Sequence, residues 1–235
     1  ELALKYNIDI LWIGARTTAS PFAIQEIADA LQGVNIPLMI KNPVNAELPL
    51  WIGAFERFQI AGLKNLVAIH RGFSGLENHI YRNIPMWHLP MELKQTFPNI
   101  PIICDPSHIA GKSDLVQKVC QLALDFSMDG LMIETHHDPS IAKSDAKQQL
   151  SPNQLTTLFN ELTSKNEFSN DQSFEHKLTY LRGHIDRLDD ELLEVLKMRC
   201  NLSSRIGEIK NKENITIFQS SRLKELLDLR NERAS

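Results

Sequence analysis

The chain has 235 residues, of which 43% are hydrophobic, and 25 basic residues against 29 acidic ones give a formal net charge of −4. This length and composition fit a globular protein of one large domain or two modest ones. The slightly acidic balance gives no reason to expect binding to a nucleic acid. No apolar run approaches the roughly 20 residues of a membrane span. We therefore expect neither a nucleic acid nor a membrane as a partner.

The cysteines and the first residues indicate the cellular setting. Cys104, Cys120 and Cys200 are scattered and do not have the spacing of a disulfide framework. A reducing compartment is therefore expected, and the predicted location is cytoplasmic. The opening run ELALKYN resembles neither a signal peptide nor a transit peptide. It lacks an initiating methionine and starts in mid-pattern, so we interpret the sequence as part of a longer chain.

Short apolar runs alternate with helix-like stretches through the first two thirds of the chain. The expected strands cover residues 8–13, 37–40, 66–69, 100–104 and 131–133, and the expected helices cover 21–32, 48–61, 91–97 and 113–126. Continuous apolar strands that alternate with helices indicate βα units with buried parallel strands. The first part of the chain is therefore predicted to be an α/β barrel or open sheet.

Charged or metal-ligating side chains follow every one of these strands. They are Arg16, Lys41, His70 with Arg71, Asp105 with His108, and Glu134, and Asp145 comes later in the chain. The carboxyl ends of parallel strands converge on one face, where ligands bind. Imidazole with two carboxylates is a ligand set for a divalent first-row metal. The three cations Arg16, Lys41 and Arg71 suit an anionic substrate such as a phosphorylated acid, because arginine matches carboxylate and phosphate oxygens bidentately.

Each of these residues also has a purely structural interpretation. Lys41 could cap a loop, Arg71 could pair with Asp105, and His70 could be a core histidine. Cys104 precedes Asp105 in a predicted strand, so the two side chains point to opposite faces. If Asp105 faces the site, Cys104 packs toward the helices, and we interpret it as a core residue.

Six runs carry a close family resemblance over residues 1–164. WIGARTT, KNPVN, AIHRGFS, CDPSHIAGK, MIETHHDP and SDAKQQL resemble the type I-beta 3-deoxy-D-arabino-heptulosonate 7-phosphate (DAHP) synthases. The resemblance implies a (β/α)8 TIM barrel, of which this chain holds strands four to eight. It implies an aldol-like condensation of phosphoenolpyruvate with erythrose 4-phosphate, giving DAHP and phosphate. The related octulosonate 8-phosphate synthase is an alternative on the same fold.

The same resemblance assigns roles to individual residues. His108, Glu134 and Asp145 would bind the divalent metal, which could be Mn, Fe, Co or Zn. Phosphoenolpyruvate would be held by Arg16, Lys41 and Arg71. Asp105, His70 and a metal-bound water remain candidates for proton transfer. The family's fourth metal ligand, a cysteine, and its Lys-Pro-Arg-Thr motif for erythrose 4-phosphate would both lie upstream of Glu1.

The pattern changes after the last barrel segment. Ser151 and Pro152 are typical of a helix start, and this helix is expected to reach residue 163 and close the barrel. Residues 165–173 are polar and are interpreted as a linker. Apolar residues then follow a heptad seam at 178, 181, 185, 188, 192, 195, 202, 206 and 209, which predicts a long helix packed on other helices. Arg199 fills the one gap, either as part of a buried anion site or with its charge extended to solvent.

Distance along this helix predicts a dimer. Seventeen residues separate Arg182 from Arg199, or roughly 25 Å at 1.5 Å per residue, too far to share one small ligand. If both serve one site, a second copy of the helix must run antiparallel beside the first. A homodimer through the helical segment is therefore expected, and a higher oligomer remains open.

The runs LRGHIDRLDDELLEVLKMR, GEIKNKE and QSSRLKELL resemble the all-helical chorismate mutase domain over residues 174–235. The resemblance implies a helical, dimer-forming domain in which Arg182 crosses into the partner's site. Arg199, Lys210 and Arg222 would bind the carboxylates and ether oxygen of chorismate, which rearranges to prephenate. Leu223 stands where the family usually has glutamate, Gln219 where aspartate is common, and the third helix is missing.

The two resemblances together predict a protein of α/β plus all-α class. Its expected domains are a partial barrel at 1–164, a linker at 165–173 and a partial mutase-like domain at 174–235. The expected function is a bifunctional shikimate-pathway enzyme, with the fusion suggesting control of the synthase by a product such as prephenate. The appended helical segment argues against the octulosonate alternative. A further alternative is that this segment only dimerises the barrel or senses a ligand.

Overall fold

The computed structural model describes residues 2–75, 79–166, 169 and 171–234, and the chain divides into two compact units, residues 1–167 and 168–235. The predicted linker at 165–173 lies partly outside the described residues, because 167, 168 and 170 are not among them. Its end was placed too late, since the first helix of the second unit already begins at Gln172. The helix begins earlier than predicted because Asp171 is its N-cap: Oδ1 of Asp171 accepts a hydrogen bond from the backbone N–H of Ser173.

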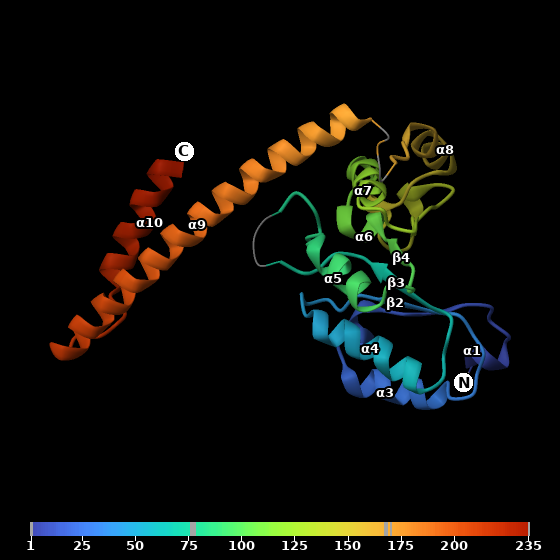
Figure 1. The fold of residues 1–235 in the computed structure, drawn as a ribbon. Helices are drawn as coiled ribbons and strands as arrows, with labels where there is room; N and C mark the ends of the chain where they lie inside the picture. The colour runs from blue at the N-terminus through green and yellow to red at the C-terminus, as the bar shows by residue number, and fades with distance from the viewer. Residues whose placement is uncertain (1, 76–78, 167–168, 170, 235) are drawn as a thin grey trace. The chain divides into compact units, whose positions relative to one another are not determined.

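The first unit contains a parallel sheet of five described strands in the order β1-β2-β3-β4-β5 (Figure 1). The strands are β1 (Leu11–Ile13), β2 (Leu38–Lys41), β3 (Leu66–His70), β4 (Ile102–Cys104) and β5 (Gly130–Leu131). Each strand pairs with the next one along the chain, as in Ile13 with Ile40 and His70 with Cys104. Parallel strands that each pair with the next one along the chain have the winding of a barrel. The predicted parallel strands are confirmed, although several are shorter than expected.

Eight α-helices accompany the sheet in the described part of the first unit. They are α1 (Leu2–Lys5), α2 (Ala15–Thr18), α3 (Pro21–Ala30), α4 (Leu48–Ile60), α5 (His88–Thr96), α6 (Pro106–Ala110), α7 (Ser113–Asp125) and α8 (Pro152–Glu161), with 3-10 turns η1 (Pro139–Ile141) and η2 (Ala146–Gln148). The four predicted helices are present, and α5 begins before the predicted residue 91. The short helices α2 and α6 were not predicted, because four or five residues carry no measurable period.

The predicted start of α8 is confirmed in detail. The hydroxyl of Ser151 accepts a hydrogen bond from the backbone N–H of Gln154, and the side chain of Gln154 accepts one from the backbone N–H of Ser151. This reciprocal pair is a capping box, and Pro152 occupies the first helical turn, where its missing N–H costs nothing. The cap fixes the point at which the chain turns from the last strand region into α8.

Two apolar clusters hold the helices against the outer face of the sheet. The first joins α3 and α4, which lie side by side in Figure 1, to outward-facing residues of β1–β4, and the second joins α7 and α8 to Cys104 and Leu150. Trp51, Phe55 and Phe58 of α4 are fully buried in the first cluster. Burial of such large side chains is the main favourable contribution to folding.

We expect Phe55→Ala to destabilise the barrel unit by about 3–5 kcal/mol, because a fully buried ring is replaced by a cavity. The ring of Phe55 lies 5.6 Å from that of Phe97 and 6.4 Å from that of Trp51. Denaturant unfolding of the full-length protein, followed by tryptophan fluorescence, measures the change. Phe22→Ala is the matched control, since the Phe22 side chain is 84% exposed and its loss should change the midpoint little.

The second unit consists of the long helix α9 (Gln172–Lys212) and α10 (Ser220–Ala234), between which the chain reverses direction (Figure 1). The predicted long helix is therefore confirmed. Eight residues of the predicted seam are 55–62% exposed in the single chain: Leu181, Ile185, Leu188, Leu192, Val195, Leu202, Ile206 and Ile209. An apolar stripe of this length is typical of a helix that packs on a partner.

None of the helices among the described residues has the length and hydrophobicity needed to cross a membrane.

Candidate active site at the carboxyl ends of the strands

A cleft of about 330 Å³ opens at the carboxyl ends of the strands. Its lining residues come from the loops and short helices that follow the strands: Trp12, Gly14, Ala15, Arg16, Lys41, Val44, Arg71, Arg82, His108 and Asp145. The predicted cations and two of the three predicted metal ligands are therefore brought together. The convergence follows from the parallel winding, which sends every strand toward the same end.

The three predicted cations enter the cleft from successive strands. Arg16 lies on α2 directly after β1, Lys41 is the last residue of β2, and Arg71 follows β3. Lys41 points into the cleft because Leu38 and Ile40 belong to the outward-facing core and strand side chains alternate. The backbone N–H of Arg71 donates to Oδ1 of the buried Asn42, which fixes where the arginine leaves the strand. Three positive side chains thus face one small volume.

The predicted metal ligands also meet. One donor atom each from His108, Glu134 and Asp145 lies within 4.8 Å of the others. His108 sits on α6, which begins directly after β4, and Nδ1 of His108 lies 3.7 Å from Oε1 of Glu134. Asp145 has a backbone φ of 50°, in the left-handed region that few non-glycine residues adopt. This unusual conformation occurs where the chain turns to bring Asp145 beside the other two.

Asp105 links the cation group to the metal-ligand group. It is 1% exposed at the N-terminus of α6, and its Oδ2 accepts a hydrogen bond from Nζ of Lys41 at 2.9 Å and lies 2.8 Å from Nδ1 of His108. Burial acts to raise the pKa of the Asp105 carboxyl, but the contacts with His108 and Lys41 outweigh it, and the pKa lies below its ordinary value. Asp105 is therefore ionised near neutral pH and holds its two neighbours in place.

Cys104 and His70 lie on the other side of the sheet. Cys104 is fully buried in the cluster with α7, where burial raises the pKa of its thiol, and the prediction of a core cysteine is confirmed. His70 is fully buried beside Phe73 and Trp87, with ring centroids 5.8 Å and 5.2 Å away. Its side chain is not part of the cleft lining. The core interpretation of His70 thus fits its place better than the proton-transfer interpretation.

His70 should make the barrel unit acid-sensitive. Burial lowers the pKa of His70 from 6.5 to about 3, so between these values the unfolded chain binds a proton that the folded chain excludes. Stability should therefore fall as the pH drops from about 6.5 toward 3, by up to about 1.4 kcal/mol per pH unit. His70→Leu should flatten this part of the curve of unfolding free energy against pH. His88→Leu, at an exposed position, is the control, and equal slopes in both variants would contradict the assignment.

Three polar residues that sequence reasoning missed support the cleft. Asn83 accepts from Nη1 of Arg71 at 2.9 Å and donates to the carbonyl of His108 at 2.6 Å, so it contacts both halves of the site. Nη1 of Arg82 donates to Oδ1 of Asp145 at 2.7 Å and to Gln148, and this contact lowers the pKa of the Asp145 carboxyl. Gln148 lies three residues after Asp145 in η2. That spacing was the only available signal, since Arg82 and Asn83 follow no strand.

Two glycines allow Arg82 and Asn83 to approach. Gly72 and Gly111 have positive φ values of 75° and 68°, and a Cβ at either would collide with the Cβ of Asn83 or Arg82 respectively. Only glycine combines that backbone conformation with so close an approach. The glycine in IHRG and the one in HIAGK are therefore part of the architecture of the site.

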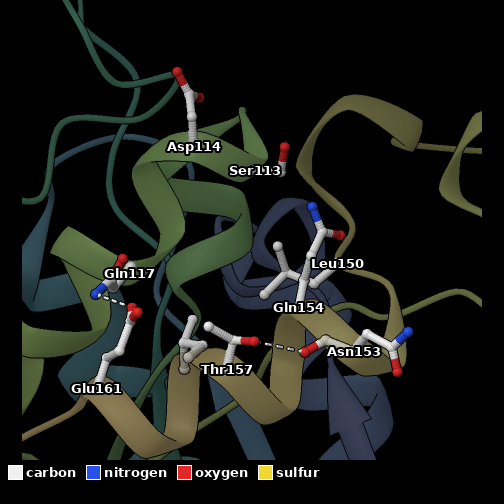
Figure 2. A pocket seen from close by; sticks show the side chains of 9 residues that line it. Ser113, Asp114, Gln117, Leu150, Asn153, Gln154, Thr157 and Glu161 are labelled. Atoms are coloured by element: carbon white, nitrogen blue, oxygen red, sulfur yellow. Dashed lines mark hydrogen bonds between the residues drawn. The ribbon is translucent and has the colours of Figure 1, made fainter.

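A second depression, between α7 and α8, has a different character (Figure 2). Figure 2 shows Gln117 of α7 hydrogen-bonded to Glu161 of α8, a 2.7 Å contact that spans the groove. The nine lining residues include the acids Asp114 and Glu161 and no lysine or arginine. A groove with this charge repels phosphorylated acids, so the cleft at the strand ends is the better candidate active site.

The basic residues of the second unit lie apart in a single chain. Arg182, Arg199 and Lys210 are all on α9, and Arg222 is on α10, where it pairs with Glu225 at 2.6 Å. Lys210 donates to the carbonyl of Ile217 in the turn between the helices. Because α9 is one unbroken helix, Arg182 and Arg199 are roughly 25 Å apart along its axis. One copy therefore cannot bring both to one small ligand.

The winding of the sheet, with three cations and a group of possible metal ligands at its carboxyl end, is that of part of an α/β barrel enzyme. Family comparison makes the class specific. The chain belongs to the DAHP synthetase I family, whose profile matches residues 3–169. The profile of chorismate mutase type II matches residues 181–235.

Individual relatives agree with both assignments. A phospho-2-dehydro-3-deoxyheptonate aldolase from Thermotoga maritima is 28% identical over 142 residues, which is 60% of this chain and 40% of that protein. A bifunctional chorismate mutase/prephenate dehydratase from Aquifex aeolicus is 44% identical over 52 residues, 22% of this chain and 14% of that protein. A truncated form of DAHP synthase from Thermotoga maritima superposes with a TM-score of 0.60 and 25% identity, covering 68% of this chain and 58% of that one. The chain thus spans well under two thirds of the length of these relatives.

Proposed function

We propose that the barrel unit condenses phosphoenolpyruvate with erythrose 4-phosphate to give DAHP and phosphate. The observation that carries this proposal is the cleft lined by Arg16, Lys41 and Arg71 together with His108 and Asp145. A carboxylate oxygen of Glu134 lies within 4.8 Å of donor atoms of His108 and Asp145, and these three residues form a trio of possible metal ligands. The cations match the carboxylate and phosphate of phosphoenolpyruvate, and the trio adjoins them where an aldehyde could be activated. Family membership and the Thermotoga maritima relative support the same reaction.

The trio fits a divalent metal. An imidazole and two carboxylates within 4.8 Å of one another form a donor set for Mn, Fe, Co or Zn. Such an ion would supply Lewis acidity toward the aldehyde oxygen of erythrose 4-phosphate. His108 is oriented by the ionised Asp105, as ligating histidines generally are by a neighbouring carboxylate.

The other residues position the substrate. Arg16, Lys41 and Arg71 hold phosphoenolpyruvate so that its methylene carbon faces the aldehyde carbon, and a C–C bond forms between them. The aldehyde oxygen takes up a proton and becomes a hydroxyl. Water adds to the positively charged carbon that bears the phosphate oxygen and gives up one proton. The bond from that carbon to the phosphate oxygen then breaks, the carbon becomes a carbonyl, and the leaving phosphate takes the second proton of the added water. The cations balance the negative charge of the phosphate throughout.

The test is consumption of phosphoenolpyruvate by the full-length protein with erythrose 4-phosphate, in the presence of Mn²⁺ or of EDTA. Metal-dependent release of phosphate is the expected result. If Mn²⁺ gives no release, Fe²⁺, Co²⁺ and Zn²⁺ are supplied in turn, and no release with any of these four metals would reject the synthase proposal. Release with EDTA at the full rate would reject only the role of the metal.

The three free cysteines fit a reducing cytoplasmic setting, so the assay should contain a reductant.

For the second unit, we infer that it rearranges chorismate to prephenate as a homodimer. The exposed stripe of α9 supplies the apolar surface that a second copy would cover, and Arg199 interrupts this stripe with a charge. An antiparallel partner would bring its Arg182 to the Arg199 site, with Lys210 and Arg222 as further anion contacts. The rearrangement is unimolecular, so positioning and charge complementarity suffice.

Mixing two inactive variants tests the shared site. Arg182→Gln and Arg199→Gln should each abolish chorismate turnover, but re-annealed mixtures should recover about a quarter of the wild-type rate, because half of the dimers regain one of two sites. No recovery, with a dimer seen by sedimentation, would reject a site shared by Arg182 of one chain and Arg199 of its partner. A monomer would reject the homodimer.

The alternative is a helical module that dimerises the barrel or senses a ligand without catalysing. Leu223 and Gln219, which depart from the residues usual in the mutase family, favour this alternative. Chorismate turnover by the full-length protein separates the two: absence of turnover, with prephenate still changing the synthase rate, would support the sensor.

A further inference from the structure

The side chain of Gln148 connects the two acidic members of the metal-ligand trio. It is 1% exposed, and its Nε2 donates to Oε2 of Glu134 at 2.8 Å. Its Oε1 accepts from Nη1 of Arg82 at 2.8 Å, and the same Nη1 donates to Oδ1 of Asp145 at 2.7 Å. One buried amide therefore contacts Glu134 directly and Asp145 through a single guanidinium nitrogen.

These contacts decide which oxygen of Glu134 is free. Oε2 is held by Gln148, whereas Oε1 lies 3.7 Å from Nδ1 of His108, on the side of the trio. The backbone of Glu134 is held as well, because its N–H donates to Oγ of the buried Ser107 at 3.0 Å. A carboxylate that is fixed at its backbone and at one oxygen presents the other oxygen in one direction.

The orientation of the Gln148 amide is fixed by its two hydrogen bonds. The amide can satisfy a carboxylate and a guanidinium together only with its NH₂ toward Glu134 and its carbonyl toward Arg82. Leaving either buried end without a partner would destabilise the folded protein. Arg82 is in turn packed against Gly111, where only a glycine leaves room for it. The network therefore has one favourable arrangement.

We propose that Gln148 is a positioning residue that orients Glu134 directly, and Asp145 through Arg82, for binding a divalent metal. This inference rests on the metal-binding part of the proposed function. The amide is buried and does not line the cleft, so its effect is exerted through the two carboxylates. Outer contacts of this kind typically change metal affinity 10–100-fold when they are removed.

The neighbouring Gln149 provides a matched control. It has the same side chain, but its Nε2 donates at 2.8 Å to the backbone carbonyl of Ser144, in the loop before Asp145, and not to a carboxylate of the trio. Gln148→Met keeps the length of the side chain and removes both of its hydrogen bonds, and Gln149→Met removes the hydrogen bond to Ser144. Both variants are made in the full-length protein and titrated with Mn²⁺ while the electron paramagnetic resonance signal of the free ion is followed.

Wild type and Gln149→Met should bind Mn²⁺ with affinities within about twofold, and Gln148→Met should bind it 10–100-fold more weakly. Melting of the metal-free proteins shows whether each variant is folded. If Gln148→Met does not fold, Gln148→Asn is used, because its shorter amide cannot reach both partners. Equal Mn²⁺ affinity in a folded Gln148 variant and wild type overturns the inference alone. Absence of Mn²⁺ binding by wild type overturns the metal site of the proposed function and the inference with it.

Discussion

His108→Gln in the full-length protein should lower metal-dependent release of phosphate from phosphoenolpyruvate by about 10³-fold or more. Metal-ion catalysis contributes several kcal/mol to such reactions, and each 1.36 kcal/mol corresponds to a factor of ten in rate. His108 is the only imidazole in the trio and lies 2.8 Å from the ionised Asp105. Its loss removes both a ligand and the partner of that carboxylate.

The matched control for His108→Gln is His137→Gln. His137 is exposed, lies three residues after Glu134 and is not a member of the trio. The rate is measured after EDTA treatment and return of Mn²⁺, over a range wide enough to detect weakened binding. A rate within tenfold of wild type at saturating Mn²⁺ would show that His108 is not needed for the chemistry. A normal rate that requires only more Mn²⁺ would assign it to affinity alone.

Arg199→Gln should lower chorismate turnover by about 10²–10³-fold, the usual cost of removing one donor to developing negative charge. The residue interrupts the apolar seam of α9, so in a dimer its charge would lie at the interface beside the substrate. Glutamine keeps a polar side chain of moderate length and does not disturb the helix, because its helix propensity is close to that of arginine.

Arg205→Gln controls for the loss of a charge from α9, because Arg205 lies on the same helix outside the predicted seam. Turnover is followed by the disappearance of chorismate, and the oligomeric state by sedimentation. A loss in Arg205→Gln as large as that in Arg199→Gln would point to a general electrostatic effect. Undiminished turnover in Arg199→Gln would remove it from the site.

The parts of this site that follow strand ends could be predicted from the sequence. Lys41, Arg71 and Asp105 each come directly after an apolar run, and parallel winding sends all such positions to one edge. Residues that reach the site from elsewhere gave no such signal. Arg82 and Asn83 contact the site only because Gly111 and Gly72 let a distant loop approach.

The direction of a side chain at a strand end was harder to predict than its place. His70 and Arg71 are adjacent, and the sequence placed both near the site. In the structure Arg71 lines the cleft, whereas His70 is buried with Phe73 and Trp87 on the helix side. The same alternation had been used to assign Cys104 and Asp105 to opposite faces, and there the prediction is confirmed.

The sequence by itself determined the succession of βα units and the long α9 helix, because these depend on local periodicity. It also predicted the trio and the cations, from their order along the chain and from the family resemblance. The tertiary structure decided which side chains share a volume. His108, Glu134 and Asp145 meet within 4.8 Å, and Gln148 orients two of them through contacts that span 14 and 66 positions of the chain. Such contacts depend on how strands and loops pack in three dimensions, and no local pattern in the sequence records them.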